Sequence, residues 1–267
     1  MSDFRVITLL TLFGLLSCSK FEYSPYQKFN EDTPSNLNAL NYLKLSEVEA
    51  AGDDTVTILF TGDSQRFYQS LDKLVAKANS IESVDMLFLA GDISDFGLLH
   101  EFHWIYERLE KLNVPYFCAI GNHDLLANGG AIYDEMFGPR NFTISYKGYK
   151  FLFHDTNGRE YDFNGTVPDI GWLASSLNDS VHLWFVGVSH VPPNNLDFDE
   201  ALEIPYKDLF ASRQNFILSL HGHLHGSDDS HLYSDHVRYI SCYAVNMDKC
   251  ILLKFINGTI IKEIINY

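Results

Sequence analysis

Five short apolar runs, each followed at once by polar residues, constrain the fold of this chain most. The runs are VTILFT, MLFLA, YFCAI, LWFVGV and NFILSL, at residues 56–61, 86–90, 116–120, 183–188 and 215–220. Continuous apolar runs of this length are typical of strands that are buried on both faces. Helical patterns separate the first three runs, at residues 67–79 and 99–112. The order β-α-β-α-β therefore predicts at least three parallel strands.

Later apolar runs are predicted to form antiparallel strands. They are FTISY, YKFLFHDT, VRYISC and CILLKFINGTIIKEI, at residues 142–146, 149–156, 237–242 and 250–264. The Asn257-Gly258 pair in the last run is typical of a two-residue hairpin turn. A chain of 267 residues is long enough for one large domain with a substantial core. We expect that domain, a mixed α/β fold, to span residues 53–267.

The five buried strands deliver polar side chains from their carboxyl ends. The segments that follow them read GDSQ, GDISD, GNHD, SH and HGHLH, and they begin at Gly62, Gly91, Gly121, Ser189 and His221. In open α/β sheets, this edge is where binding sites form. A glycine lets the backbone turn sharply at such a point and brings the next side chain close to a shared centre.

Each of these segments has a plain structural interpretation when it is taken alone. A Gly-Asp pair after a strand is usually a turn, and a buried histidine is more often a hydrogen-bonded core residue. Together they favour a metal site, because converging Asp63 and Asp92 carboxylates would repel each other without cations between them. Mixed oxygen and imidazole donors without a thiolate suit Mn²⁺, Fe²⁺, Zn²⁺ or similar ions better than Ca²⁺.

Over residues 55–260 the sequence resembles the calcineurin-like metallophosphoesterases. The motifs of that family are D-x-H, G-D-x-x-D, G-N-H-[DE], a single H and G-H-x-H, in this order. Here they read D-S-Q, G-D-I-S-D, G-N-H-D, the histidine of VSHVPP and G-H-L-H. The resemblance implies a four-layer α-β-β-α sandwich. In this fold, helices flank two mixed β-sheets, and a dinuclear metal site lies at the strand ends.

The resemblance also implies which residues hold two divalent metal ions. The first ion would be held by Asp63, Gln65, Asp92 and His225, and the second by Asp92, Asn122, His190 and His223. The sequence departs from the family pattern at Gln65, where a histidine is usual. An amide oxygen is a weaker, neutral donor. The first ion is therefore expected to bind more weakly, to be a harder cation, or to complete its coordination with water.

Two metal ions about 3.5–4 Å apart would supply a hydrolytic mechanism. When bound, such ions would turn a water into hydroxide that attacks phosphorus in line, and they would neutralise the developing phosphoryl charge. His123, next to Asn122, is expected to protonate the leaving oxygen as general acid. Asp95 is expected to hold that imidazole and favour its charged form. Asp124 is expected to be structural.

The formal net charge of −16 narrows the range of substrates. A protein that grips a nucleic acid backbone needs a basic face, and this sequence has no basic stripe. We therefore expect a phosphohydrolase that acts on a small phosphomonoester or phosphodiester rather than on a nucleic acid polymer. Two alternatives stay open. One is a nuclease of the same superfamily, and the other is a surface-anchored protein that binds a phosphorylated ligand with little or no turnover, which Gln65 alone supports.

The N-terminal residues predict an export signal. VITLLTLFGLL at residues 6–16 is too short to span a bilayer, which needs about 20 apolar residues, but it fits the core of a signal peptide. Ser17 and Cys18 follow, and residues 1–17 with this cysteine resemble a bacterial lipoprotein signal. The expected product is exported from the cytoplasm and lipid-anchored to the cell envelope through Cys18, with residues 18–52 as a tether. The alternative is a buried helix with a chance cysteine.

Overall fold

The computed structural model describes residues 27–48 and 54–267. The predicted signal peptide and Cys18 lie outside these residues, as does part of the predicted tether. Within the described ranges, no helix has both the length and the apolar character that crossing a bilayer requires.

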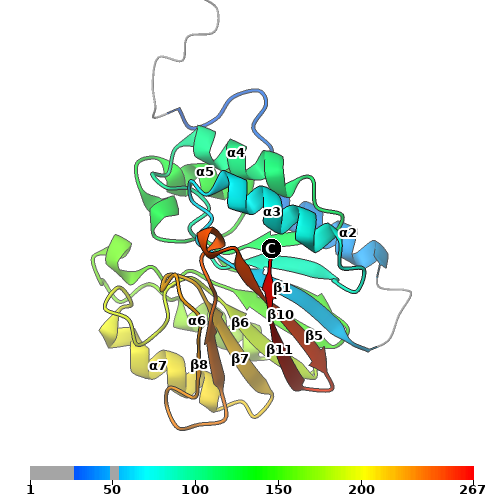
Figure 1. Cartoon of the computed structure of the whole chain (residues 1–267). Helices are drawn as coiled ribbons and strands as arrows, with labels where there is room; N and C mark the ends of the chain where they lie inside the picture. Colours follow the sequence, from blue (N-terminus) through cyan, green and yellow to red (C-terminus); the bar gives the residue numbers. More distant parts are fainter. Residues whose placement is uncertain (1–26, 49–53) are drawn as a thin grey trace, which may run out of the picture.

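Two β-sheets packed face to face form the centre of the molecule (Figure 1). The first sheet has the strand order β11-β10-β1-β2-β3, with the bounds Thr259–Asn266, Lys249–Ile256, Val56–Thr61, Met86–Leu89 and Tyr116–Cys118. The second has the order β4-β5-β6-β7-β9-β8, with the bounds Phe142–Tyr146, Tyr149–Phe153, Trp184–Val188, Phe216–His221, Arg238–Ser241 and Asp228–Ser230. All five strands predicted from continuous apolar runs are present.

The first sheet confirms the predicted parallel core and the predicted hairpin. β1 pairs in parallel with β2, and β2 pairs in parallel with β3. Every residue of these three strands is buried, as expected for strands covered on both faces. β10 and β11 pair antiparallel across Asn257 and Gly258, which both have positive φ angles of 47° and 78°. Two successive positive φ angles are the backbone of a type I′ turn.

The prediction that the later runs are all antiparallel is wrong for two pairings in the second sheet. β4 and β5 do pair antiparallel. However, β5 pairs in parallel with β6, and β9 pairs in parallel with β7. The short strand β8 lies antiparallel to β9 and takes the chain back along the sheet before β9 begins. A strand of three residues is too short to be recognised from its sequence pattern, so the reversal was missed.

Helices cover the outer face of each sheet and complete the four predicted layers (Figure 1). The first sheet carries α2 (Leu37–Val48), α3 (Tyr68–Asn79), α4 (Leu99–Leu109) and α5 (Gly129–Met136). The second sheet carries α6 (Ile170–Leu177) and α7 (Glu200–Ala211). Three apolar clusters separate the layers: one lies between the sheets, and one lies under each set of helices.

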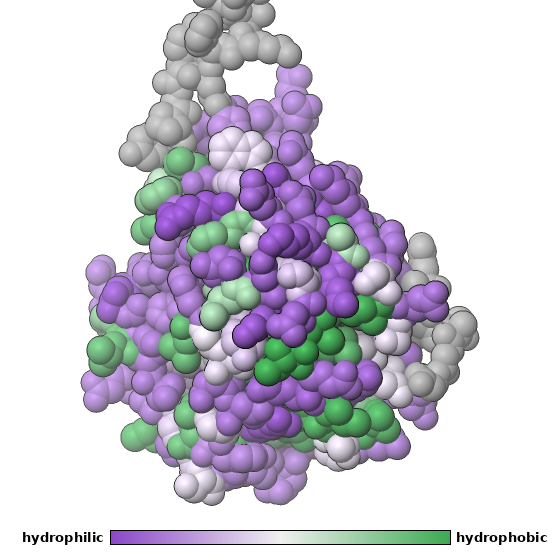
Figure 2. Space-filling model, viewed as in Figure 1, coloured by the Kyte–Doolittle hydropathy of each residue, from purple (hydrophilic) through white to green (hydrophobic). Residues whose placement is uncertain are grey.

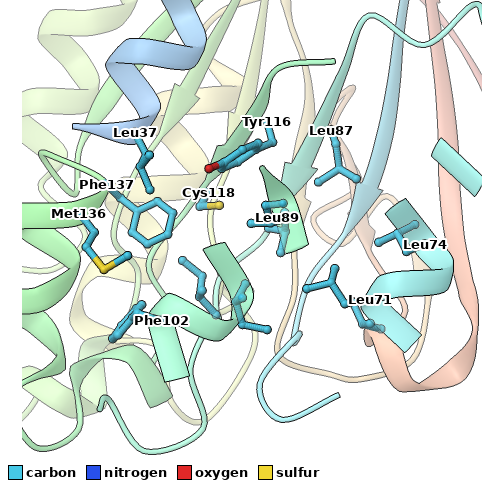
Figure 3. Packing of buried hydrophobic residues seen from close by; sticks show 14 of the residues in the cluster. Leu37, Leu71, Leu74, Leu87, Leu89, Phe102, Tyr116, Cys118, Met136 and Phe137 are labelled. Atoms are coloured by element: carbon cyan, nitrogen blue, oxygen red, sulfur yellow. The ribbon is translucent and has the colours of Figure 1, made fainter. Parts of the chain in front are cut away.

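The helix α3 shows why these segments fold as they do. Its buried residues are Leu71, Leu74, Val75 and Ala78, which recur at the spacing of one helix face. This face packs in the same cluster as Leu87 and Leu89 of β2 (Figure 3). The apolar spacing of α3 thus fixes one helix across the first sheet, directly beside the segment that follows β1.

The helix α2 lies in the segment that was predicted to be a tether, and two of its side chains form hydrogen bonds with β3. The Asn38 side chain accepts a hydrogen bond from the backbone nitrogen of Cys118 (3.0 Å) and donates one to the Cys118 carbonyl oxygen (3.2 Å). Asn41 accepts a bond from the backbone nitrogen of Tyr116 (3.2 Å). These asparagines pair with backbone groups on the open edge of β3, where a sheet otherwise exposes unpaired groups.

The surface shown in Figure 2 is mostly hydrophilic, as the strong net negative charge leads one to expect. Hydrophobic side chains gather on this face over β10 and β11, where Ile256, Ile261 and Ile264 are exposed. The functional residues predicted from the sequence lie elsewhere, in the loops that follow the parallel strands.

Candidate metal centre

The loops that follow the parallel strands are joined to one another by backbone hydrogen bonds. After β1 and β2, the backbone nitrogens of Asp63 and Gln65 donate to the carbonyl oxygens of Gly91 and Asp92, each at 3.0 Å. After β6 and β7, the Gly222 nitrogen donates to the His190 carbonyl oxygen, also at 3.0 Å. Each sheet therefore holds its own loops in register, and the polar side chains on them have fixed starting points.

The two sheets meet at this point. The His190 Nδ1–H donates a hydrogen bond of 2.6 Å to the Ala90 carbonyl oxygen at the end of β2. Gly222 packs against the same carbonyl, because a Cβ on this residue would lie 2.5 Å from that oxygen. A side chain at residue 222 would push the second sheet away from the first. The glycine of the G-H-L-H motif thus permits the close approach that brings donors from both sheets together.

Most of the predicted ligands have an unusual backbone conformation. Positive φ angles between 37° and 68° occur at Asp63, Gln65, Asp92, His223 and His225. Non-glycine residues adopt this left-handed region rarely, and such strain gathers at functional sites. The strands end here in sharp turns whose conformation the packed loops impose. The consequence is that all five side chains lie where the two sheets meet.

At the centre are Asp63, Asp92 and His190, which are all buried. One ligand atom from each of them lies within 4.8 Å of the others. Neither carboxylate oxygen of Asp63 has a hydrogen-bond partner among the described residues. Burying a charge without a partner costs several kcal/mol, so buried carboxylates are paired or bind metals. The donor set fits a divalent cation, because such an ion would satisfy the orphaned oxygens.

The other predicted ligands surround this centre. The Asn122 Oδ1 atom lies 3.0 Å from His190 Nε2 and 3.2 Å from His223 Nδ1. On the opposite side, His225 Nε2 lies 3.4 Å from Asp63 Oδ1. The structure therefore brings together side chains that the sequence separates by more than half the chain length. Their division between two metal ions stays a prediction.

Gln65 also points into this centre. Its side-chain nitrogen donates a hydrogen bond of 3.2 Å to Asp92 Oδ2. The amide oxygen is then the atom that is left for a cation, and it is the weak neutral donor expected from the sequence. In this arrangement the side chain also holds the Asp92 carboxylate.

Electrostatics in the centre are dominated by its carboxylates. Burial opposes a charge on His190, but the nearby Asp92 carboxylate, its hydrogen bond and Asp63 outweigh burial and raise the pKa of His190 to about 10. Burial likewise opposes the charge on Asp92, yet its attraction to His190 lowers the pKa of Asp92 to about 2. A proton on His190 balances part of the negative charge in the metal-free chain. A divalent cation placed there would balance it more completely.

His123 occupies the mouth of the site and is half-buried. Its backbone nitrogen donates to Asp92 Oδ1 (2.9 Å), and its Nε2 atom lies 4.0 Å from Asp92 Oδ2. Asp95 lies against this ring with both its backbone carbonyl and its carboxylate. The Nδ1–H of His123 donates to the Asp95 backbone carbonyl (2.7 Å), and the nearer carboxylate oxygen is 3.9 Å away. That carboxylate also pairs with Arg66 at 2.7 Å.

Asp124 has the structural role that was expected of it. Its carboxylate accepts hydrogen bonds from the backbone nitrogens of Ile93, Ser94 and Gly121, and it joins the loops after β2 and β3. Burial and the charge of Asp92 raise the pKa of Asp124 to about 7, against the effect of these bonds. The Asp124 carboxylate therefore stabilises the conformation of the loops that carry Asp92 and Asn122.

Two residues near the centre were missed by reasoning from the sequence. Asp197 lies in the loop between β6 and α7, and its Oδ2 atom is 3.3 Å from His223 Nε2. Arg159, in the short helix η2 (Gly158–Tyr161), pairs with Asp197. No motif marks either residue, because the loop NNLDFDE reads as an ordinary polar connection. Only the fold places it against the G-H-L-H segment.

Known proteins resemble this chain in sequence and in fold. One relative is a probable cyclic nucleotide phosphodiesterase of Coxiella burnetii, which is 29% identical over 151 residues. The match covers 53% of this chain and 60% of that protein, so it spans less than two thirds of the relative.

Solved structures show the same fold. A dimetal phosphatase from Danio rerio has a TM-score of 0.59 at 13% identity, and the match covers 78% of this chain and 98% of that one. A purple acid phosphatase from yellow lupin (Lupinus luteus) has a TM-score of 0.55 at 11% identity, covering 79% of this chain and 54% of that one. At such low identity the likeness speaks for the fold alone.

The family comparison covers the strands and loops that build the centre. The profile described as calcineurin-like phosphoesterase matches residues 56–227, which is more than half of the chain and holds every predicted ligand. The chain therefore belongs to the calcineurin-like phosphoesterase family.

Proposed function

We propose that this protein is a metal-dependent phosphohydrolase that cleaves a small phosphodiester or phosphomonoester. One observation carries the proposal: two buried carboxylates and a buried imidazole converge within 4.8 Å, and both oxygens of Asp63 lack a hydrogen-bond partner among the described residues. A purely structural cluster would pair those oxygens within the protein. A cluster that binds a cation leaves them for the ion.

Two divalent ions are the cofactors that we propose. The residues that would hold them are Asp63, Gln65, Asp92, Asn122, His190, His223 and His225. When bound, such ions activate water as a nucleophile and neutralise the charge that develops on the phosphoryl oxygens. The chain itself contributes rigid donors, since its loops are joined by backbone hydrogen bonds and need little rearrangement.

We propose that His123 acts on the leaving oxygen. Its Nδ1–H is committed to the Asp95 carbonyl, which leaves Nε2 as the nitrogen on the side of Asp92. That nitrogen can carry a proton to the departing oxygen atom of the ester. Asp95 contributes through its backbone, and its carboxylate pairs with Arg66, which is 63% exposed at the rim.

Cyclic nucleotides are the first substrate class to examine. The supporting observation is the match to a probable cyclic nucleotide phosphodiesterase, and a small diester suits a strongly acidic protein better than a polymer does. A nuclease would need a basic surface to bind the phosphate backbone. A binding protein without turnover would have support only in Gln65, which still points at Asp92.

The first prediction tests the function itself. The purified full chain, loaded with Mn²⁺, should hydrolyse bis-p-nitrophenyl phosphate and 3′,5′-cyclic AMP, because its site has the donors for a phosphodiesterase. Chelation followed by dialysis should abolish the activity, and added Mn²⁺ should restore it. Single-stranded DNA serves as the comparison substrate. Absence of turnover with Mn²⁺, Fe²⁺ and Zn²⁺ on every phosphoester would contradict the proposal, and preferred cleavage of DNA would favour a nuclease.

The second prediction concerns His123. His123→Ala should lower the rate on alkyl phosphodiesters by about 10²–10⁴-fold, the usual contribution of a general acid. The loss should be much smaller with p-nitrophenyl esters, whose leaving group departs without a proton. Metal content, measured by elemental analysis, should stay unchanged, and His231→Ala is a matched control on another strand connection. An equal loss on both ester types would rule out the proposed role.

The third prediction concerns Gln65. Gln65→His should lower the Mn²⁺ concentration that gives half-maximal rate, because imidazole is a stronger donor to transition metals than an amide oxygen. Gln65→Ala should raise that concentration. The measurement is the rate against Mn²⁺ concentration for the wild type and both variants. If the three curves overlay, Gln65 is no ligand and only holds Asp92.

A further inference from the structure

Asp197 contacts a predicted metal ligand from the side that faces away from the centre. Its carboxylate is largely buried, with 13% of the side chain exposed, and its Oδ2 atom lies 3.3 Å from His223 Nε2. The other ring nitrogen of His223 lies 3.2 Å from Asn122 Oδ1 and 3.3 Å from His190 Nε2. The imidazole of His223 therefore lies between a carboxylate on one side and the remaining predicted ligands on the other.

This arrangement selects one tautomer of the ring. A neutral imidazole carries a single N–H, and a carboxylate can only accept a hydrogen bond. Asp197, as a charged acceptor, favours the proton on Nε2 of His223 over the neutral acceptor Asn122 Oδ1, which lies 3.2 Å from Nδ1. The lone pair is then on Nδ1, which faces Asn122 and His190. Carboxylates that accept the second N–H of a histidine orient the ring and make it a better metal ligand.

His190 faces the same centre with Nε2, whereas His223 faces it with Nδ1. The Nδ1–H of His190 donates to the Ala90 carbonyl oxygen at 2.6 Å, so Nε2 is the nitrogen that faces Asn122. The acceptor of His190, the Ala90 carbonyl, lies at Nδ1, whereas the acceptor of His223, the Asp197 carboxylate, lies at Nε2. The nitrogens that face the centre are therefore Nε2 of His190 and Nδ1 of His223. The backbone orients His190, whereas a side chain orients His223, and only the second can be removed by substitution.

The protein also holds Asp197 in place. Arg159 contacts its Oδ1 atom, which leaves Oδ2 for His223. The backbone nitrogen of Arg159 donates to the Asp197 carbonyl (3.1 Å), and the Asp197 nitrogen donates to Asn195 Oδ1 (2.9 Å). With both backbone groups and one carboxylate oxygen fixed, the remaining oxygen has one direction to point. An aspartate that served only to pair with an exposed arginine would not need contact with the ring.

We propose that Asp197, supported by Arg159, is a positioning residue that fixes the His223 tautomer and presents Nδ1 to a divalent metal ion. The proposal rests on the function proposed above. It adds a residue that lies outside the family motifs and that acts through His223 rather than on the substrate.

The test uses the full chain and has two readouts. The first is the tautomer of His223 in the metal-free protein, measured by long-range ¹⁵N–¹H correlations at a pH where the ring is neutral. The wild type should carry its proton on Nε2, and Asp197→Ala should move population to Nδ1. The second is Mn²⁺ affinity, measured by calorimetric titration of the metal-free protein. Loss of an orienting carboxylate typically costs about 10–100-fold in affinity.

Three variants make the result decisive. Asp197→Ala should weaken one class of Mn²⁺ site by about 10–100-fold, and the isosteric Asp197→Asn should weaken it less, because an amide oxygen can still accept the N–H. Asp229→Asn is the matched control, since Asp229 also pairs with an arginine, Arg238, on another part of the surface. Its affinity should equal that of the wild type. If Asp197→Ala does not fold, the tautomer of His223 in the metal-free wild type decides, because a proton on Nδ1 would overturn the proposal.

Failure of this inference is distinct from failure of the proposed function. A wild type that binds no divalent metal would contradict the function. A wild type that binds metal, with affinities of both Asp197 variants within twofold of it, would overturn the role of Asp197 alone. So would an Nδ1-protonated His223 in the metal-free wild type.

Discussion

The repulsion between two buried carboxylates is the constraint on which the rest of this structure depends. Asp63 and Asp92 end neighbouring parallel strands, so the fold forces them toward the same point. Two negative charges within 4.8 Å of each other repel strongly in a buried environment of low polarity. His190 offsets part of that charge from the second sheet, and the Asp63 oxygens, which accept no hydrogen bond from the described residues, mark where a cation is still needed.

The surrounding architecture serves to hold this unfavourable group in place. Residues in left-handed conformations cost of order 1–3 kcal/mol each, and they persist only where packing over-determines them. Here the packing comes from three apolar clusters that fix the strands, from Asp124, which ties two loops together, and from Gly222, which lets the sheets touch. The packed core thus holds the loops in strained backbone conformations, and these conformations direct the predicted ligands toward the centre.

The sequence predicts this centre well because its chemistry is local to each strand end. An apolar run followed by Gly-Asp or Gly-Asn predicts both where the strand ends and which side chain follows it. Asp63, Asp92 and Asn122 could therefore be predicted as metal ligands. Contacts between distant loops leave no such pattern. Asp197 and the backbone contact of Asp95 to His123 were therefore missed, as was the parallel pairing of β9. The docking of helix α2 through Asn38 likewise depends on an edge strand far along the chain.

The most direct test of this account is the position of metal ions in crystals of the Mn²⁺-loaded protein, located by anomalous scattering. The account predicts two peaks that share Asp92, one beside Asp63 and His225 and the other beside Asn122, His190 and His223. Peaks remote from these residues, or a single peak at full loading, would contradict the claim that the converging carboxylates form a two-metal centre.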